Sequence, residues 1–276
     1  MLKKIFKVLG VIILLLVITY CLLIIFVRPS TNRDWALDQA VLPYAEITGK
    51  NINIYNIRNF KYKTVSVFFP EYYDKKVNLE DLTSVDFVVE PFSGYVGAAH
   101  TFLTFGFKDG SHIAISVEIR KEKGESFSAL KGLLRKYELM YVIADEKDVV
   151  KLRTNYRHDQ VFLYPIKTTT EKIQSLFIDM LNRTNKLKND PEFYNTLTNT
   201  CTTNIVSHLN KLTDNKVFPY SLDVLFPANS DEIALKHKLI NTDKTTIQEV
   251  RQEFNINKKA EEFADSPDFS IKIRER

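Results

Sequence analysis

The sequence predicts an α+β protein with an antiparallel sheet, preceded by one transmembrane helix. Residues 8–27 form an uncharged, apolar run of 20 residues. Apolar and polar residues alternate in 98–107 and 112–120, which indicates strands. Apolar residues at helical spacing in 126–137 and 170–188 indicate helices. A β-rich first half followed by longer helices is typical of the α+β class.

The apolar run is long enough to cross a bilayer, because 20 residues at 1.5 Å each match a hydrocarbon core of about 30 Å. Lys3, Lys4 and Lys7 precede the run, which favours a cytoplasmic N-terminus and an exported remainder. A cleaved signal peptide is the alternative, but its apolar region is usually about 7–15 residues and ends at a small-residue cleavage site. We therefore expect a single-pass signal anchor.

Charge divides the chain into two regions. Residues 1–34 form the expected anchor and linker, and residues 35–276 form the expected extracytoplasmic domain. The chain has 38 Lys and Arg against 34 Asp and Glu, and four basic residues but no acidic ones lie within residues 1–30. The remainder is formally neutral. Because a nucleic-acid-binding protein needs a basic stripe, that class is excluded.

Shorter elements complete the predicted order. Residues 51–69 alternate often enough to indicate strands, residues 161–166 indicate another strand, and residues 231–239 indicate a short helix. The tail from about residue 255 is charged, and we expect it to pack weakly.

The two alternating segments around residue 110 predict a β-hairpin. Lys108-Asp109-Gly110 suits a type I turn followed by a left-handed glycine. Placing Phe107 opposite Ser111 gathers the apolar side chains on one face, with Ile113, Ile115, Val117 and Ile119 opposite Phe105, Leu103, Thr101 and Ala99. On the other face this register places Glu118 beside His100, about 5 Å apart at Cβ.

Cys201 is the only cysteine outside the apolar run, so no intramolecular disulfide can form in the exported region. Asn199 or Thr200 suits the N-cap of a helix whose apolar face carries Ile205, Val206, Leu209 and Leu212. Cys201 is then expected in the first helical turn, where backbone N–H groups and the helix dipole favour a thiolate. A buried structural cysteine is the other interpretation.

A nucleophilic thiol needs a histidine base with an orienting partner. His100 fits best, because Glu118 faces it across the predicted hairpin. His208 lies seven residues after Cys201 on one helix face, about 10 Å away by helical rise. His112 shares the face of His100 at the other end of the hairpin, and whether it or another group replaces Glu118 as the third member stays open. His158 and His237 have the character of surface residues.

Five stretches resemble, in the same order, the N-terminal periplasmic domain of the bacterial lipoprotein N-acyltransferase family Lnb; they are 97–105, 115–125, 152–157, 193–204 and 226–232. The resemblance spans roughly residues 35–245. A strand-borne His, a hairpin with a third polar group and a later Cys at a helix start are also similar to the circularly permuted papain-like group, which includes the lecithin:retinol acyltransferase type. The resemblance implies a permuted papain-like (NlpC-type) domain with a Cys-bearing helix.

The resemblance also implies a function. An acyl chain would pass through a thioester on Cys201 from a membrane phospholipid to the N-terminal amine of a bacterial lipoprotein. His100 would be the base and Glu118 its orienting partner. The protein would sit in the inner (cytoplasmic) membrane with its C-terminal domain in the periplasm or extracytoplasmic space. Three arginines are candidates to hold a phosphate head group, although ion-paired structural roles are favoured for each; they are Arg120, Arg153 and Arg157.

Two alternative functions stay open. One is a thiol hydrolase of the same fold, acting either on lipids or as a cell-wall amidase or peptidase. The other is a non-catalytic, anchored binding domain with a buried Cys201. No metal or other cofactor is expected, because His-x-x-x-His and Cys-x-x-Cys spacings do not occur and residues 106–110 form a turn rather than a phosphate loop.

Overall fold

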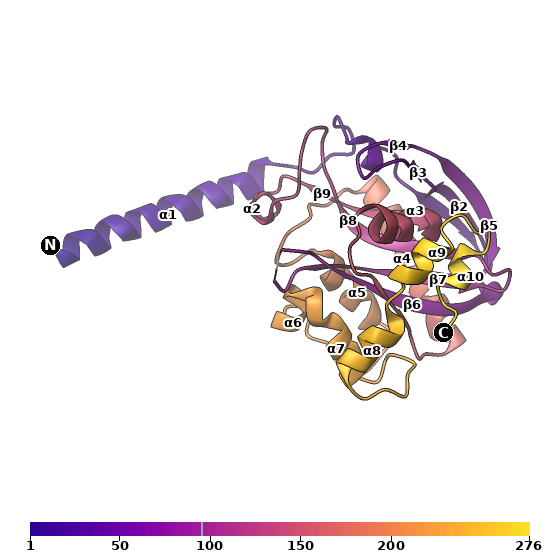
Figure 1. Ribbon diagram of the computed structural model, residues 1–276. Coiled ribbons are helices and arrows are strands. Elements are labelled where there is room, and N and C mark those ends of the chain that lie inside the picture. Colours follow the sequence, from indigo (N-terminus) through magenta and orange to yellow (C-terminus); the bar gives the residue numbers. More distant parts are fainter. Residues whose placement is uncertain (95) are drawn as a thin grey trace.

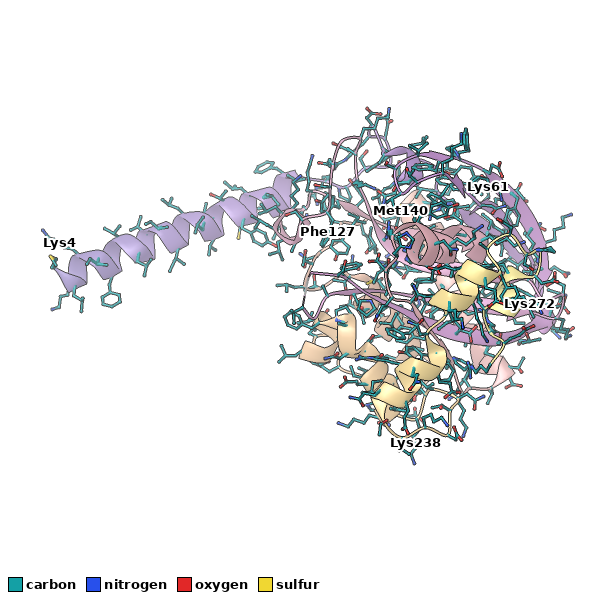
Figure 2. All side chains as sticks on the ribbon, in the orientation of Figure 1. Lys4, Lys61, Phe127, Met140, Lys238 and Lys272 are labelled. Atoms are coloured by element: carbon teal, nitrogen blue, oxygen red, sulfur yellow. The ribbon has the colours of Figure 1, made fainter. Side chains whose placement is uncertain are left out.

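A mixed α+β body carries one long apolar helix that projects away from it (Figure 1). The computed structural model describes residues 1–94 and 96–276, apart from the side chain of Asp223. Helix α1 (Leu2–Phe26) has the length and composition to cross a membrane and has no buried residue. Figure 2 shows Lys4 at its free end and Phe127 where it meets the body. The predicted α+β class behind one apolar helix is confirmed.

The body is built on an eight-stranded sheet in the order β1-β2-β9-β8-β7-β6-β10, with β5 also paired to β2. Neighbouring strands are antiparallel except β2 and β9. The strands are β1 (Tyr44–Thr48), β2 (Asn51–Arg58), β5 (Tyr72–Asn78), β6 (Leu82–Pro91), β7 (Ala99–Phe107), β8 (His112–Arg120), β9 (Glu138–Asp145) and β10 (Phe162–Pro165), with β3 (Lys61–Tyr62) and β4 (Phe68–Phe69) as a separate pair.

Helices cover both faces of this sheet. An apolar cluster on one face includes side chains from α4, α5, α7 and α8, and a second cluster on the other face includes side chains from α3, α9 and α10. The elements are α2 (Ala129–Leu133), α3 (Glu146–Lys151), the π-helical turn η3 (Leu152–Tyr156), α4 (Thr170–Asn189), α5 (Cys201–Leu209), α6 (Leu222–Leu225), α7 (Ser230–Lys236), α8 (Ile247–Phe254), α9 (Asn257–Glu262) and α10 (Phe269–Lys272), with the short 3-10 turns η1 (Leu37–Gln39), η2 (Leu79–Asp81) and η4 (Pro227–Asn229).

The β7–β8 hairpin has the predicted register. Leu103 lies opposite Ile115 and Phe105 opposite Ile113, and all four side chains belong to the cluster under α4 and α5. Gly110 has φ +80° and closes the three-residue loop. Going away from the turn, the regular β7–β8 pairing ends at Phe102 and does not reach His100, which lies two residues further along β7.

Two predictions about the helices need correction. The tail from residue 255 does not pack weakly, because Ile256, Ala260 and Phe269 are buried against the second face and Arg274 pairs with Asp86 and Glu146. The helix predicted over 126–137 is confined to Ala129–Leu133, because Arg135 has φ +58° and the chain turns into β9.

Candidate active site

The first turn of α5 carries Cys201. Thr200 is the N-cap and forms a reciprocal capping box with Thr203. In the described part of the chain, the backbone N–H groups of Cys201 and Thr202 donate no hydrogen bond. The thiol is half-buried, and its Sγ lies 3.7 Å from Oγ1 of Thr202. The helix start therefore presents a partly accessible sulfur beside two N–H groups without a protein acceptor.

Asparagine side chains hold the turn that leads into Cys201. Oδ1 of Asn195 accepts from the backbone N–H of Leu197 at 2.9 Å, and Nδ2 of Asn199 donates to the carbonyl of Phe193 at 2.9 Å. Nδ2 of Asn204 donates to Oδ1 of Asn199 and to the carbonyl of Thr200, both at 2.8 Å. These bonds explain why this turn is rich in asparagine.

A series of buried hydrogen bonds holds α5 in place near its C-terminal end. Nδ1 of His208 lies 2.6 Å from Oδ2 of Asp179, and Nε2 of His208 lies 2.7 Å from the hydroxyl of Tyr141. That hydroxyl donates to Oδ1 of Asn204 at 3.2 Å. His208 thus has a structural position between α4 and β9 and makes no described hydrogen bond to Cys201.

His100 contacts Glu118 through a serine. Nε2 of His100 lies 2.7 Å from Oγ of Ser116, which donates to Oε1 of Glu118 at 3.0 Å; the direct distance from Nε2 to Oε1 is 3.8 Å. Because the serine proton points to the carboxylate, Nε2–H of a neutral imidazole donates to Ser116 and Nδ1 carries the free lone pair. Within the described contacts, Nδ1 has no hydrogen-bond partner.

Arg153 governs the charge of this cluster. Its guanidinium is buried, with Nε 2.6 Å from Oε2 of Glu90 and Nη2 3.3 Å from Oε1 of Glu118. Burial, followed by the charge of Arg153, lowers the pKa of His100 from 6.5 to about 4. Burial alone would raise the pKa of Glu118, but Arg153 and His100 lower it well below the ordinary range. Near neutral pH the imidazole is uncharged and the carboxylate is ionised.

The structure brings His100 and Glu118 together but does not join Cys201 to them by a hydrogen bond. Oγ1 of Thr101 lies 3.1 Å from Oγ1 of Thr202, so α5 begins directly against β7. Successive strand residues point to opposite faces, and His100 packs on Phe102, which lies on the face opposite α5. Thr101 and Thr202, the residues next to His100 and Cys201 in the sequence, are therefore in contact, whereas the side chains of His100 and Cys201 contact different partners.

The remaining sequence candidates have structural contacts. Arg120 donates to the carbonyls of Gln39 and Ala40 and stacks over Trp35 at 4.1 Å. Arg157 lies 3.4 Å from Glu90. Nδ1 of His112 lies 3.1 Å from the carbonyl of Gly110 at the hairpin turn, away from Glu118.

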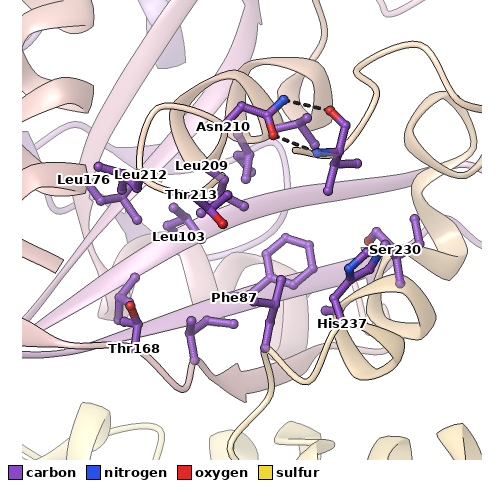
Figure 3. A pocket seen from close by; sticks show the side chains of 18 of the residues that line it. Phe87, Leu103, Thr168, Leu176, Leu209, Asn210, Leu212, Thr213, Ser230 and His237 are labelled. Carbon is purple, nitrogen blue, oxygen red and sulfur yellow. Dashed lines mark hydrogen bonds between the residues drawn. The ribbon is translucent and has the colours of Figure 1, made fainter. Parts of the chain in front are cut away.

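A cavity of about 290 Å³ lies between α5 and the face of the sheet that α4 and α5 cover (Figure 3). Its wall includes Thr202, Ile205 and Val206 from α5, together with Leu103 from β7. The cavity therefore begins at the residue that follows Cys201.

A family model described as the Lnb N-terminal periplasmic domain matches residues 68–228. The chain belongs to the Lnb N-terminal periplasmic domain family. The matched segment runs from β4 to the start of η4 and contains His100, Glu118 and Cys201. Comparison with curated proteins and with solved structures gave no match.

Membership of the Lnb domain family indicates a periplasmic, lipoprotein-related role. A periplasmic domain preceded by α1 also fits a single-pass membrane anchor with the body outside the cytoplasm.

Three parts of this Lnb domain site escaped the sequence reasoning. The hairpin register puts Ser116 opposite Phe102, on the same face as His100 and Glu118, and this position is the signal for a relay. Glu90 lies directly opposite His100, but on β6, a strand that was not predicted. Thr202 needed the packing of α5 on β7, which sequence spacing does not reveal.

Replacing His100 with Gln is expected to reduce the fall in the free energy of unfolding that occurs as the pH is lowered. Between about pH 6.5 and 4 the unfolded chain binds a proton on this residue that the folded chain does not, so stability falls as the pH falls, by up to about 3 kcal/mol. Glu118 acts mainly at lower pH, because its carboxyl takes up a proton in the unfolded chain only near its ordinary pKa of 4.5 and in the folded chain below that. Urea unfolding of the reconstituted chain at several pH values measures the change.

His112 and His208 also have pKa values lowered by burial, so part of the pH dependence will remain in the His100→Gln variant. The exposed His237 supplies the control, and His237→Gln should leave the curve unchanged. An identical slope in the wild type and His100→Gln would contradict the assignment of a neutral, buried imidazole.

Proposed function

We propose that this protein is a membrane-anchored, extracytoplasmic acyltransferase that works through a thioester on Cys201. It moves an acyl chain from a membrane phospholipid to the N-terminal amine of a bacterial lipoprotein, at the outer side of the inner membrane. The observation that carries the proposal is the match to the Lnb domain over a segment containing the thiol, the histidine and the carboxylate.

In the first half of the proposed reaction, the thiol of Cys201 gives its proton to Nδ1 of His100, and the sulfur attacks the carbonyl carbon of a phospholipid ester. The two free N–H groups at the start of α5 stabilise the resulting oxyanion. The C–O bond then breaks, His100 returns the proton to the departing alcohol, and an acyl thioester remains.

In the second half, the lipoprotein amine attacks the thioester carbonyl and gives its proton to His100. The C–S bond breaks, the amide is released, and the sulfur recovers the proton. Glu118 acts on the imidazole through Ser116 and keeps Nδ1 free for these transfers. His100 packs on the face of β7 opposite α5, so this mechanism requires its side chain to turn toward Cys201 when lipid is bound.

The proposed intermediate can be trapped directly. The full chain, reconstituted in phospholipid vesicles, is expected to gain the mass of one acyl group at Cys201, and hydroxylamine should remove it. Addition of a lipopeptide with a free N-terminal amine should discharge the adduct as an amide, and mass spectrometry detects both steps.

Each other result has a definite meaning. Free fatty acid without any acylated amine would replace the transferase with a thiol hydrolase of the same fold. An unmodified Cys201 under turnover conditions, together with no reaction toward a thiol reagent at neutral pH, would overturn the enzyme proposal in favour of an anchored binding domain.

A further inference from the structure

The cavity beside α5 is apolar along most of its wall. Leu103 and Val85 form its floor on the sheet, Leu176 comes from α4, and Ile205, Val206 and Leu209 come from α5. Its volume of about 290 Å³ is close to the lower end of the usual range for small-molecule sites. An apolar space of this size takes a hydrocarbon ligand more readily than a polar one.

The cavity extends along α5 from the catalytic end of that helix. Thr202 and Leu209 both line it and are separated by about 10 Å of helical rise. Oγ1 of Thr202 is also the group 3.7 Å from Sγ of Cys201. A chain attached to that sulfur therefore has an apolar path directly beside its point of attachment.

Two polar features of the wall point to an occupant. Ser230 is buried, lines the cavity, and within the described residues its Oγ has no hydrogen-bond partner. Buried hydroxyl groups normally have a partner, so this one is available to a ligand or to solvent. At the rim, Lys167 and Lys172 are exposed.

Asn210 closes the wall at the far end of α5. Its Nδ2 donates to the carbonyl of Val217 at 2.7 Å, and its Oδ1 accepts from the N–H of Val217 at 2.8 Å, as the dashed lines in Figure 3 show. These two hydrogen bonds hold the segment between Asn210 and Val217 against the cavity, whose wall also includes Leu212 and Thr213. The enclosed length along α5 is thus limited.

We infer that this cavity binds the acyl chain carried by the enzyme and sets which chain lengths it accepts. The choice of ligand rests on the proposed function, whereas the apolar wall and its position beside Cys201 do not. The chain enters at Thr202 and lies along Ile205 and Val206 toward Leu209. Ordinary membrane acyl chains fill the cavity, and shortening it selects against the longer ones.

Val206→Phe narrows the cavity at its middle and provides the main test. In vesicles of octanoyl, lauroyl or palmitoyl phosphatidylethanolamine, this variant should lose palmitoyl adduct on Cys201 by about tenfold or more and retain octanoyl adduct. Ser207 is the matched control, because it is the next residue of the same helix and is exposed. Ser207→Phe should keep the wild-type profile.

A second variant guards against misfolding. Ala234→Leu adds bulk from α7 on another wall of the cavity, and it should shift the chain-length profile in the same direction. Urea unfolding identifies which of the two variants keeps the wild-type transition, and the profile is read from that one. An unchanged profile in a folded variant would overturn the inference.

Photocrosslinking tests the cavity without the chemistry. The full-length Cys201→Ala variant is placed in vesicles containing a palmitoyl phospholipid with a diazirine at the chain end, and the labelled peptides are mapped. Labels on α5 or on residues 212–217 are expected, and Val206→Phe in the same background should reduce them. Labels confined to α1 would contradict the inference.

The two experiments separate the proposals. Crosslinks in the cavity without any wild-type adduct on Cys201 would support acyl-chain binding and overturn the acyltransferase. A wild-type adduct whose length profile ignores a folded Val206→Phe variant would support the acyltransferase and overturn the cavity as its chain site.

Discussion

Replacing Cys201 with Ser is expected to lower lipoprotein acylation by at least about 10³-fold, because a hydroxyl in place of the thiol is a far weaker nucleophile in a site built around a neutral imidazole. The thioester adduct should disappear completely. The measurement is transfer of a labelled acyl chain to a lipopeptide by the full chain in vesicles. Secondary structure and unfolding should remain unchanged, since Sγ makes a single described polar contact, with Thr202.

The chain contains its own control for this substitution. Cys21 is an exposed residue of α1, so Cys21→Ser should keep wild-type acylation and wild-type adduct formation. Equal activity of the wild type and Cys201→Ser would eliminate a cysteine-based mechanism. Loss of activity in both variants would point to the anchor rather than to the thiol.

Arg153→Ala is expected to cause the largest loss of stability, about 3–5 kcal/mol, because it leaves the buried carboxylate of Glu90 without its closest cation. The midpoint of thermal unfolding should fall on the order of 10 °C. Arg157 also approaches Glu90, at 3.4 Å, and keeps the loss from being larger. Thermal and urea unfolding of the reconstituted chain measure both quantities.

A surface ion pair provides the comparison. Lys50 and Glu80 are both exposed, so Lys50→Ala should change stability by less than about 1 kcal/mol. Adding Glu90→Gln to Arg153→Ala should recover part of the loss, because an amide is less costly to bury than an unpaired charge. Equal effects of Arg153→Ala and Lys50→Ala would show that the buried network does not hold η3 on the sheet.

The β7–β8 hairpin could be predicted down to its register because local information determines it. The turn residues Lys108-Asp109-Gly110 define the loop, and strict alternation allows one assignment of faces. Helix α4 was predicted to within a residue at its C-terminal end for a similar reason, since apolar residues at helical spacing throughout 170–188 indicate a helix.

Strands β6 and β9 could not be predicted in the same way. Both lie inside the sheet and are covered by helices on their two faces. β9 is therefore mainly apolar on both sides, and β6 buries the carboxylates Asp86 and Glu90, so exposure does not alternate along either strand. The buried tail was misjudged for another reason. The tail is mainly charged and contains only a few apolar residues that become buried, such as Phe269. The pairing of Arg274 with Asp86 joins residues 188 positions apart, so local sequence does not indicate it.

The same contrast between local information and tertiary packing applies to the candidate site. The helix-start position of Cys201 and the nearness of Glu118 to His100 follow from capping and register, which are local. The position of His100 relative to Cys201 depends on how α5 packs on β7, and the cavity depends on elements from β6 to α7. Those distances arise only from tertiary packing.

In the proposed acyltransferase, the junction between α1 and the body determines how Cys201 meets the donor lipid. Nη1 of Arg135 donates to the carbonyl of Ile24 at 3.1 Å, and Arg33 pairs with Glu138 at 2.8 Å, so the chain leaving α1 is held against the body at once. An enzyme held in this way would meet lipids by diffusion within the plane of the membrane rather than through bulk solution. Its encounter rate follows the mole fraction of donor lipid in the bilayer, and diluting the membrane with inert lipid slows it as effectively as removing substrate.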